Sequence, residues 1–208
     1  MNVNFVKKYF PDLISWEELS NLINIRPIFN KERVQFLSDV EYSWEKYTWA
    51  RDSSCVPSSI LKKEIENNIV YFTDMSKCTE NINYLSSMIE TEYESPVDAH
   101  IYVSKNVDID HPFGIHYDHS HNVIVQCEGQ TTFEVWERIY HKEGDININL
   151  SVDENPIMKV VMDPGDAIFV PAYYLHRATS LSPRLSVSFP FTPHKYVTGF
   201  QERNWIKL

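Results

Sequence analysis

Two residue types that build common binding loops and covalent frameworks are scarce in this sequence, which has five glycines and three cysteines in 208 residues. It contains neither a GxGxxG nor a Walker A motif, so the glycine-rich phosphate-binding loops are excluded. The cysteines are odd in number, widely spaced and without a CxxC pair. This argues against a disulfide framework and against a thiolate zinc site. A reducing, cytoplasmic location is therefore predicted.

Basic residues are also in short supply, and long apolar runs are missing. Nineteen Lys and Arg against 29 Asp and Glu give a formal net charge of −10. This charge opposes attraction to phosphate backbones and to anionic lipid, so we expect no nucleic acid and no membrane as partner. No stretch approaches the ~18 apolar residues of a membrane-spanning helix. A hydrophobic share of 43% with 23% charged residues is typical of a folded globular domain.

Helical patterns fill the first hundred residues, and strand patterns fill most of the rest. Ser15 and Glu18 form a capping-box pattern ahead of an apolar helical face, which predicts a helix over 15–25. Weaker amphipathic periodicity predicts three more helices, over 31–39, 58–67 and 81–90. Short β-rich runs bounded by turn residues predict strands over 99–103, 115–127, 131–140, 157–162, 166–170 and 184–189.

These patterns together predict an α+β fold, in which helices cover one outer face of an antiparallel β-sandwich or barrel. No internal repeat and no linker-like segment divides the chain. We therefore expect a single domain over 1–208. Its residues 1–98 are expected to be mainly helical, 99–191 to form the β-barrel core, and 192–208 to be a C-terminal tail.

The β-rich half contains a set of side chains that suits a metal ion. His116 and Asp118 are two residues apart, and residues two apart on a strand point to the same face. A second histidine, His176, follows a predicted strand that ends at Pro171. Two histidines and one aspartate can occupy one face of an octahedral ion and leave up to three positions open, an arrangement associated with non-heme Fe(II) oxygenases.

The spacing of these residues resembles the cupin superfamily and, within it, the JmjC-type 2-oxoglutarate oxygenases. The resemblance covers about residues 99–191. The first cupin motif is matched in spacing, with Asp in place of its second His and Asn in place of its Glu, and the second motif is matched except that Tyr173 stands where Gly is usual. The matching positions are His116, Asp118, Asn122 and Gly129 in the first motif and Gly165, Pro171 and His176 in the second.

This resemblance implies a double-stranded β-helix with N-terminal helices packed outside it. It also implies an enzyme that binds Fe(II) through His116, Asp118 and His176 and uses 2-oxoglutarate and O2 to hydroxylate a C–H bond. Oxidative decarboxylation would convert 2-oxoglutarate to succinate. The residues that would bind 2-oxoglutarate are, by the same resemblance, Asn122, Tyr102, Arg184, Ser186 and Thr131.

Thr131 is a departure, because the family usually has Lys or Arg there to pair with the distal carboxylate of 2-oxoglutarate. We expect Arg184 to replace that cation, because a planar guanidinium can hold a carboxylate through two parallel hydrogen bonds. In the run 184–189, Arg184, Ser186 and Ser188 share one strand face while the apolar residues share the other. Arg177 and Arg138 are the competing cations.

Other interpretations remain open from the sequence. The chain could be a metal-dependent cupin enzyme that does not use 2-oxoglutarate, such as an isomerase or a substrate-cleaving dioxygenase, or a noncatalytic cupin binding module. Arg184 could be a surface cation. The sequence does not identify the substrate, which is either a protein side chain or a small molecule, and it leaves a homodimer open.

The sequence assigns no ligand role to the remaining aromatic and histidine side chains. His119 and His121 have the opposite parity to the expected ligands and are predicted to face solvent or lie in a loop. The aromatic stretch 42–49 is expected to fill the junction between helices and barrel, or to cover the substrate. No role follows from the spacing of the remaining histidines, which are His100, His111, His141 and His194.

Overall fold

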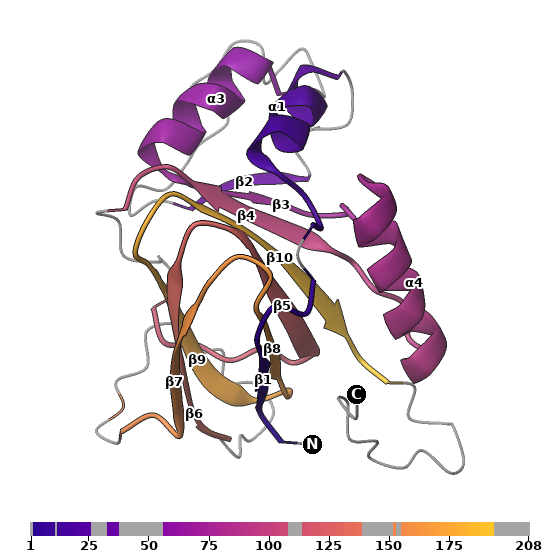
Figure 1. Ribbon diagram of the computed structural model, residues 1–208, viewed down its shortest axis with the longest axis vertical. Helices are drawn as coiled ribbons and strands as arrows, with labels where there is room; N and C mark the ends of the chain where they lie inside the picture. The colour runs from indigo at the N-terminus through magenta and orange to yellow at the C-terminus, as the bar shows by residue number, and fades with distance from the viewer. Residues whose placement is uncertain are drawn as a thin grey trace.

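Two antiparallel sheets face each other in this computed structural model, and helices lie on the side of the larger sheet that is turned away from the smaller one (Figure 1). The structure describes residues 2–10, 12–25, 33–37, 56–107, 114–138, 152 and 155–193. The helices are α1 (Trp16–Asn24), α3 (Ser58–Asn67) and α4 (Glu80–Tyr93). The strands are β1 (Asn4–Val6), β2 (Val34–Leu37), β3 (Ile69–Phe72), β4 (His100–Ser104), β5 (His121–Glu128), β6 (Thr131–Arg138), β7 (Met158–Met162), β8 (Ala167–Val170), β9 (Tyr174–Ser180) and β10 (Arg184–Phe191).

Local sequence signals place the helices as expected. The capping box of α1 forms in full, because Glu18 N donates to Ser15 Oγ at 3.2 Å and Ser15 N donates to the Glu18 carboxylate at 2.8 Å. Thr79 caps α4 in the simpler way, by accepting from Ile82 N at 3.1 Å. The apolar faces of the three helices share one core with the outer face of the large sheet. The helices predicted over 15–25, 58–67 and 81–90 are thereby confirmed.

The larger sheet has the order β1-β8-β5-β10-β4-β3-β2, and the smaller has the order β7-β6-β9. From β4 onward the chain repeatedly crosses between the two sheets, so strands distant in sequence become neighbours. An isolated bridge between His116 and His176 extends the smaller sheet beside β9. This topology is the double-stranded β-helix that the sequence resemblance implies. A second, smaller core of apolar side chains lies between the sheets.

Strand β10 follows the alternation that its sequence predicts. Leu185, Val187 and Phe189 belong to the core beneath the helices. Arg184 and Ser188 face the opposite way and line a pocket between the sheets. The polar face of β10 is therefore the inner wall of the barrel, which is where a binding site is expected in this architecture.

One turn depends on glycine. Gly129 connects β5 to β6 with φ +73°, and a Cβ added there would lie 1.8 Å from the carbonyl oxygen of Pro183. Only glycine fits this close approach of two chain segments. The turn thus fixes how the chain leaves the large sheet at the end of β5 and enters the small sheet with β6.

Several sequence-based expectations need correction. The segment 31–39 is not a helix where the structure describes it, because β2 pairs there with β3. Strands β1, β3 and β9 were not predicted, and the strand expected over 115–127 begins only at His121. Strands of three or four residues, such as β1, β2 and β3, are too short to show a clear alternation, so their pairing in the sheet decides their structure. No helix in the described segments is long and apolar enough to span a membrane.

Candidate metal centre and anion pocket

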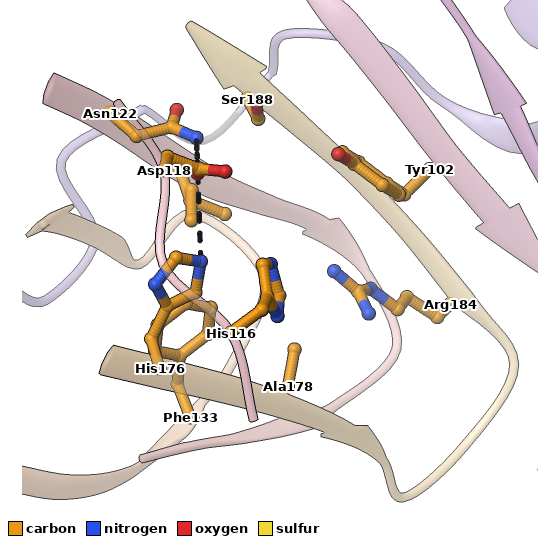
Figure 2. Close-up of a pocket in the computed structure, with 10 residues that line it drawn as sticks. Tyr102, His116, Asp118, Asn122, Phe133, His176, Ala178, Arg184 and Ser188 are labelled. Atoms are coloured by element: carbon orange, nitrogen blue, oxygen red, sulfur yellow. Dashed lines mark hydrogen bonds and ion pairs between the residues drawn. The ribbon is translucent and has the colours of Figure 1, made fainter. Parts of the chain in front are cut away.

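Three side chains from two segments that are distant in sequence converge between the sheets. His116, Asp118 and His176 each offer one ligand atom, and these atoms all lie within 4.8 Å of one another. His176 Nε2 is 3.6 Å from Asp118 Oδ2, and the two imidazole rings have their centroids 4.3 Å apart. Figure 2 shows the three side chains directed toward a common point. The sequence-based prediction that these residues meet is therefore satisfied by the geometry.

Backbone hydrogen bonds hold the segments of this cluster together. His116 and His176 exchange both of their backbone hydrogen bonds, at 3.1 and 2.8 Å, across the isolated bridge. Tyr173 N donates to the carbonyl oxygen of Asp118 at 2.8 Å. Tyr173 has φ +69°, a left-handed conformation that a residue with a large side chain rarely adopts. The turn before His176 thus keeps the geometry of the usual glycine while carrying an aromatic ring.

The two imidazoles are oriented for binding a metal through Nε2. His116 Nδ1 lies 3.2 Å from the carbonyl oxygen of Gly114, and His176 Nδ1 lies 3.1 Å from that of Tyr174. A carbonyl only accepts, so Nδ1 carries the proton in each ring and Nε2 carries the lone pair. Asn122 Nδ2 donates to Asp118 Oδ2 at 3.3 Å and orients the carboxylate.

The environment also keeps His116 in the neutral form that a metal requires. Burial lowers the pKa of His116 to about 4, and the neighbouring His176 acts in the same direction. Asp118 and the contact with Gly114 oppose this shift but do not cancel it. The imidazole is therefore deprotonated near pH 7 and available to a metal ion.

Arg184 is a buried cation with an unused donor. Its side chain is 4% exposed, and its Nε donates to Ser186 Oγ at 3.0 Å. Its Nη1 has no hydrogen-bond partner among the described residues. Burial lowers the pKa of Arg184 to about 10, with the nearby Tyr102 acting in the other direction, so the guanidinium stays charged at neutral pH. A buried charge with an unsatisfied donor is costly unless a ligand completes it.

The metal-ligand cluster and Arg184 line one small cavity between the sheets. Besides Arg184 Nη1, two buried polar atoms of residues that line it, Asn122 Oδ1 and Ser188 Oγ, have no partner within the described segments. Three unsatisfied polar atoms around one small cavity suit a polar ligand with several oxygens. The remaining wall is apolar and is supplied by Ile124, Phe133 and Ala178.

The residues predicted to contact 2-oxoglutarate divide into two groups. Tyr102, Asn122 and Arg184 line the cavity (Figure 2). Ser186 and Thr131 are not among the lining residues: Ser186 acts through Arg184, and Thr131 is buried in β6 with an Oγ1 that has no partner among the described residues. Direct contact of Ser186 and Thr131 with a ligand in this cavity therefore has no geometric support.

The competing cations are not in the cavity either. Arg177 pairs with Glu134 on the outside of the small sheet, with Nε to carboxylate at 3.0 Å, and its side chain is 41% exposed. The side chain of Arg138 lies outside the described part of the structure, as do the aromatic stretch 42–49 and His111, His141 and His194. His119 is exposed beside the rings of Tyr117 and Tyr173, and His121 begins strand β5, where it accepts from Ala172 N at 3.1 Å. Neither belongs to the metal-ligand cluster.

Two features of the site went unrecognised in the sequence. Ser188 lines the cavity. The signal for this was present in the sequence, because Ser188 shares a strand face with Arg184. His100, which its spacing left without a role, connects Asp98 to Tyr71 behind Tyr102. No motif marks that connection, because it depends on the pairing of β3 with β4.

Comparison with known proteins agrees with this architecture. The family model described as JmjC domain matches residues 74–198, more than half of the chain. The chain belongs to the JmjC domain family. The match begins ahead of α4, so this JmjC domain includes a helix as well as the barrel.

Among curated proteins, this JmjC domain is similar to the bifunctional lysine-specific demethylase and histidyl-hydroxylase NO66 of Drosophila persimilis and of Drosophila pseudoobscura pseudoobscura. Each is 21% identical over 198 residues, which is 91% of this chain but 28% and 20% of the two relatives. The chain therefore spans about a quarter of the length of these relatives.

Among solved structures, this JmjC domain resembles YcfD, a ribosomal oxygenase from Escherichia coli. The complex of YcfD with cobalt and 2-oxoglutarate has a TM-score of 0.57 at 19% identity, covering 93% of this chain and 49% of YcfD. The complex with cobalt and succinic acid has a TM-score of 0.56 at 18% identity, with the same coverage. At this level of identity the likeness supports the fold.

Proposed function

We propose that this JmjC domain is an Fe(II)- and 2-oxoglutarate-dependent oxygenase that hydroxylates a C–H bond. The observation that carries the proposal is the shared cavity, in which two Nε2-presenting histidines and an aspartate lie beside a buried arginine with an unused donor. Three ligands on one side of an ion leave positions open for a chelating cosubstrate and for O2. His116, Asp118 and His176 are the proposed ligands.

The donor set also fits 2-oxoglutarate. Arg184 would hold the distal carboxylate, and Ser188 Oγ and the Tyr102 hydroxyl lie on the same inner wall of the barrel. Asn122 orients Asp118 through Nδ2, while its Oδ1 is unsatisfied. A ligand with two carboxylates would thus complete Arg184 and Ser188, the unpaired groups of the cavity that can donate.

The division of labour between the protein and its cofactors follows from these contacts. When bound, iron, 2-oxoglutarate and O2 supply the oxidative decarboxylation to succinate and the oxygen atom that enters the substrate. The protein orients the histidine rings through Gly114 and Tyr174, fixes the carboxylate through Asn122, and keeps water away with Ile124 and Phe133. Fixed geometry of this kind favours one reaction over others.

A protein side chain is the favoured substrate. The relatives are a lysine-specific demethylase and histidyl-hydroxylase and a ribosomal oxygenase, according to their names. The net charge of −10 favours a basic protein or peptide over an acidic one. We place the protein in the cytoplasm, in keeping with its few cysteines, of which Cys78 and Cys127 are free thiols in the structure. A homodimer stays a prediction that sedimentation would test.

One observation favours a second candidate, a cupin enzyme that uses its metal without 2-oxoglutarate. Thr131 replaces the usual cation of the family and does not line the cavity. Arg184 argues against this candidate, because a buried guanidinium with an unused donor is costly unless an anion binds to it.

A single spectroscopic experiment separates the candidates. Under anaerobic conditions, Fe(II) and then 2-oxoglutarate are added, and the weak visible charge-transfer band of the chelate is followed. The oxygenase gives the band, and His116→Ala loses it together with the metal. Metal binding without the band would support the 2-oxoglutarate-independent enzyme, and absence of metal binding would support a noncatalytic module.

A further inference from the structure

A line of hydrogen-bonding groups runs from the surface to the wall of the cavity. His100 Nε2 lies 2.8 Å from Asp98 Oδ2, and His100 Nδ1 lies 2.6 Å from the Tyr71 hydroxyl. Tyr71 and Tyr102 are directly opposite each other on β3 and β4, with ring centroids 4.6 Å apart and a hydrogen bond between their side chains. Tyr102 lines the cavity, where the Arg184 guanidinium lies 5.6 Å from its ring centroid (Figure 2).

Both tyrosines are protonated at neutral pH. Burial raises the pKa of Tyr71 and of Tyr102 well above the usual value of 10. Each hydroxyl therefore has one proton, which it can donate in only one direction. The direction in which the hydroxyl protons are donated is therefore set at His100, the end of the line away from the cavity.

A neutral His100 directs the protons away from the cavity. The Asp98 carboxylate only accepts, so the ring proton is on Nε2 and Nδ1 accepts from Tyr71. Tyr71 has then used its proton and can only accept from Tyr102. The Tyr102 hydroxyl consequently points its proton at Tyr71, and a carboxylate in the cavity meets only its oxygen.

A protonated His100 reverses this order. Both ring nitrogens then donate, Nε2 to Asp98 and Nδ1 to the Tyr71 oxygen. Tyr71 passes its proton toward Tyr102, and the Tyr102 hydroxyl becomes able to donate to a ligand in the cavity. Consecutive hydrogen bonds polarise one another, so a charge on the imidazole strengthens each bond along the line.

Charged groups around His100 set the balance between the two directions. Asp98 faces it directly: burial raises the pKa of this carboxyl, but the bond to His100, the backbone N–H of Asp74 and the charge of Arg33 outweigh burial and lower it. Arg33 is itself paired with Asp74. On the neighbouring β10, the uncharged Ser188 is paired in register with His100.

The cavity side adds two opposite charges. Asp118 acts electrostatically on both tyrosines, and Arg184 acts on Tyr102. A carboxylate bound at Arg184 would add negative charge at the inner end of the line. That charge favours a donating Tyr102 hydroxyl and, through Tyr71, a protonated His100.

We propose that Asp98, His100 and Tyr71 are positioning residues that set the direction of the Tyr102 hydroxyl, and that 2-oxoglutarate binding at Arg184 is coupled to uptake of a proton at His100. The inference rests on the proposed function, since it takes 2-oxoglutarate as the anion. By linkage, affinity for 2-oxoglutarate falls as pH rises, because a proton is taken up together with the ligand. One proton limits the change to at most about tenfold per pH unit.

The test uses the intact protein loaded with Co(II), so that the metal ligands are already deprotonated. Calorimetric titration with 2-oxoglutarate in buffers of different ionisation enthalpy gives the number of protons taken up, and repeating it between about pH 6.5 and 8.5, around and above the usual histidine pKa, gives the affinity at each pH. Tyr71→Phe interrupts the line while keeping the ring, and His100→Gln removes the titrating group. Tyr84→Phe is the matched control, because Tyr84 on α4 is 67% exposed.

The expected result is proton uptake and an affinity that falls with pH in the wild type and in Tyr84→Phe. Both Tyr71→Phe and His100→Gln should lose the uptake and the pH dependence. Nitrogen NMR should show the His100 ring moving from the Nε2-protonated neutral form toward imidazolium when 2-oxoglutarate binds. A purely structural role for His100 predicts no such change.

Other outcomes separate the two proposals. If the wild type binds 2-oxoglutarate without proton uptake, or if Tyr71→Phe keeps the wild-type uptake, the coupling is refuted and the oxygenase proposal stands. If the Co(II)-loaded wild type does not bind 2-oxoglutarate at any pH, the proposed function fails and the coupling fails with it.

Discussion

Two residues at the candidate site have features that are unfavourable for stability. Arg184 is buried with a donor unused, and Tyr173 adopts a backbone conformation that suits glycine. Neither feature favours folding. Arg184 lines the cavity, and Tyr173 N donates to the carbonyl oxygen of the candidate ligand Asp118. Residues that break local rules in this way often mark functional sites. Each allows a prediction that substitution can test.

Replacing Arg184 by methionine should separate folding from cosubstrate binding. The free energy of unfolding of the metal-free protein should be unchanged or higher by ~1–4 kcal/mol, because a buried, incompletely paired charge is removed. The affinity for 2-oxoglutarate should fall by at least roughly 30-fold, since loss of one partner of a buried charged contact costs ~2–5 kcal/mol. Urea unfolding and calorimetry measure the two quantities. Arg177→Met, on the outer surface, should show the opposite pattern, and a large loss of stability in Arg184→Met would contradict this view.

Two substitutions at Tyr173 should isolate the cost of its left-handed backbone. Both Tyr173→Ala and Tyr173→Gly remove the ring contacts with Tyr117 and His119, so their difference reports the backbone alone. We expect the glycine variant to be more stable by about 1 kcal/mol in urea unfolding. At Tyr84, inside helix α4, the same pair should reverse in sign, because alanine is the better helix former. Equal stability of the two variants at 173 would argue against strain.

At the scale of helices and strands, the sequence was informative where a pattern was long or capped. The capping box predicted α1, and the alternation of β10 predicted its inner and outer faces. Strand β3 could not be recognised, because a run of four apolar residues fits a buried helix or a buried strand equally well.

The site was predictable to a similar extent. Its candidate metal ligands follow from motif spacing, whereas the proposed roles of His100 and Ser188 depend on which strands lie side by side. Pairing between distant strands leaves no local mark in the sequence. For the same reason, the spacing of Thr131 from Gly129 does not predict that Thr131 lies outside the cavity wall.

The small sheet should owe part of its stability to Glu134. This carboxylate is 8% exposed and is shared between Arg177 and Lys159, the latter at 2.9 Å. Burial raises its pKa, but the two cations outweigh burial and lower it below the usual 4.5. Its contribution is therefore present above pH 4.5 and is lost as pH falls through the lowered value. Glu134→Gln should cost ~1–2 kcal/mol at pH 7 in urea unfolding, after discounting for the exposed cations. The difference from wild type should shrink in acid, and a difference independent of pH would exclude the ion pairs as its source.

For the whole molecule, ligands that join separate segments should raise thermal stability. A metal at the candidate centre would join the segment of His116 and Asp118 to strand β9 through His176. At a free concentration 100 times its dissociation constant, such a ligand adds ~2.7 kcal/mol, or roughly 5–10 °C in Tm for a domain of this size. Differential scanning calorimetry with Co(II) measures the shift. A chelator should reverse it, Asp118→Ala should not show it, and an equal shift in Asp118→Ala would place the metal elsewhere.

Residues 4–10 belong to the barrel, although they precede the JmjC match by more than sixty positions. Strand β1 pairs with β8, Lys8 N donates to Asp166 Oδ1 at 2.9 Å, and Tyr9 N donates to the Gly165 carbonyl at 2.8 Å. Trimming the chain to residues 74–198 would remove β1 and leave the edge of β8 unpaired, next to the turn before His176. A protein shortened to begin at residue 74 would therefore tend to aggregate. A fusion partner attached there would not restore the pairing that β1 provides.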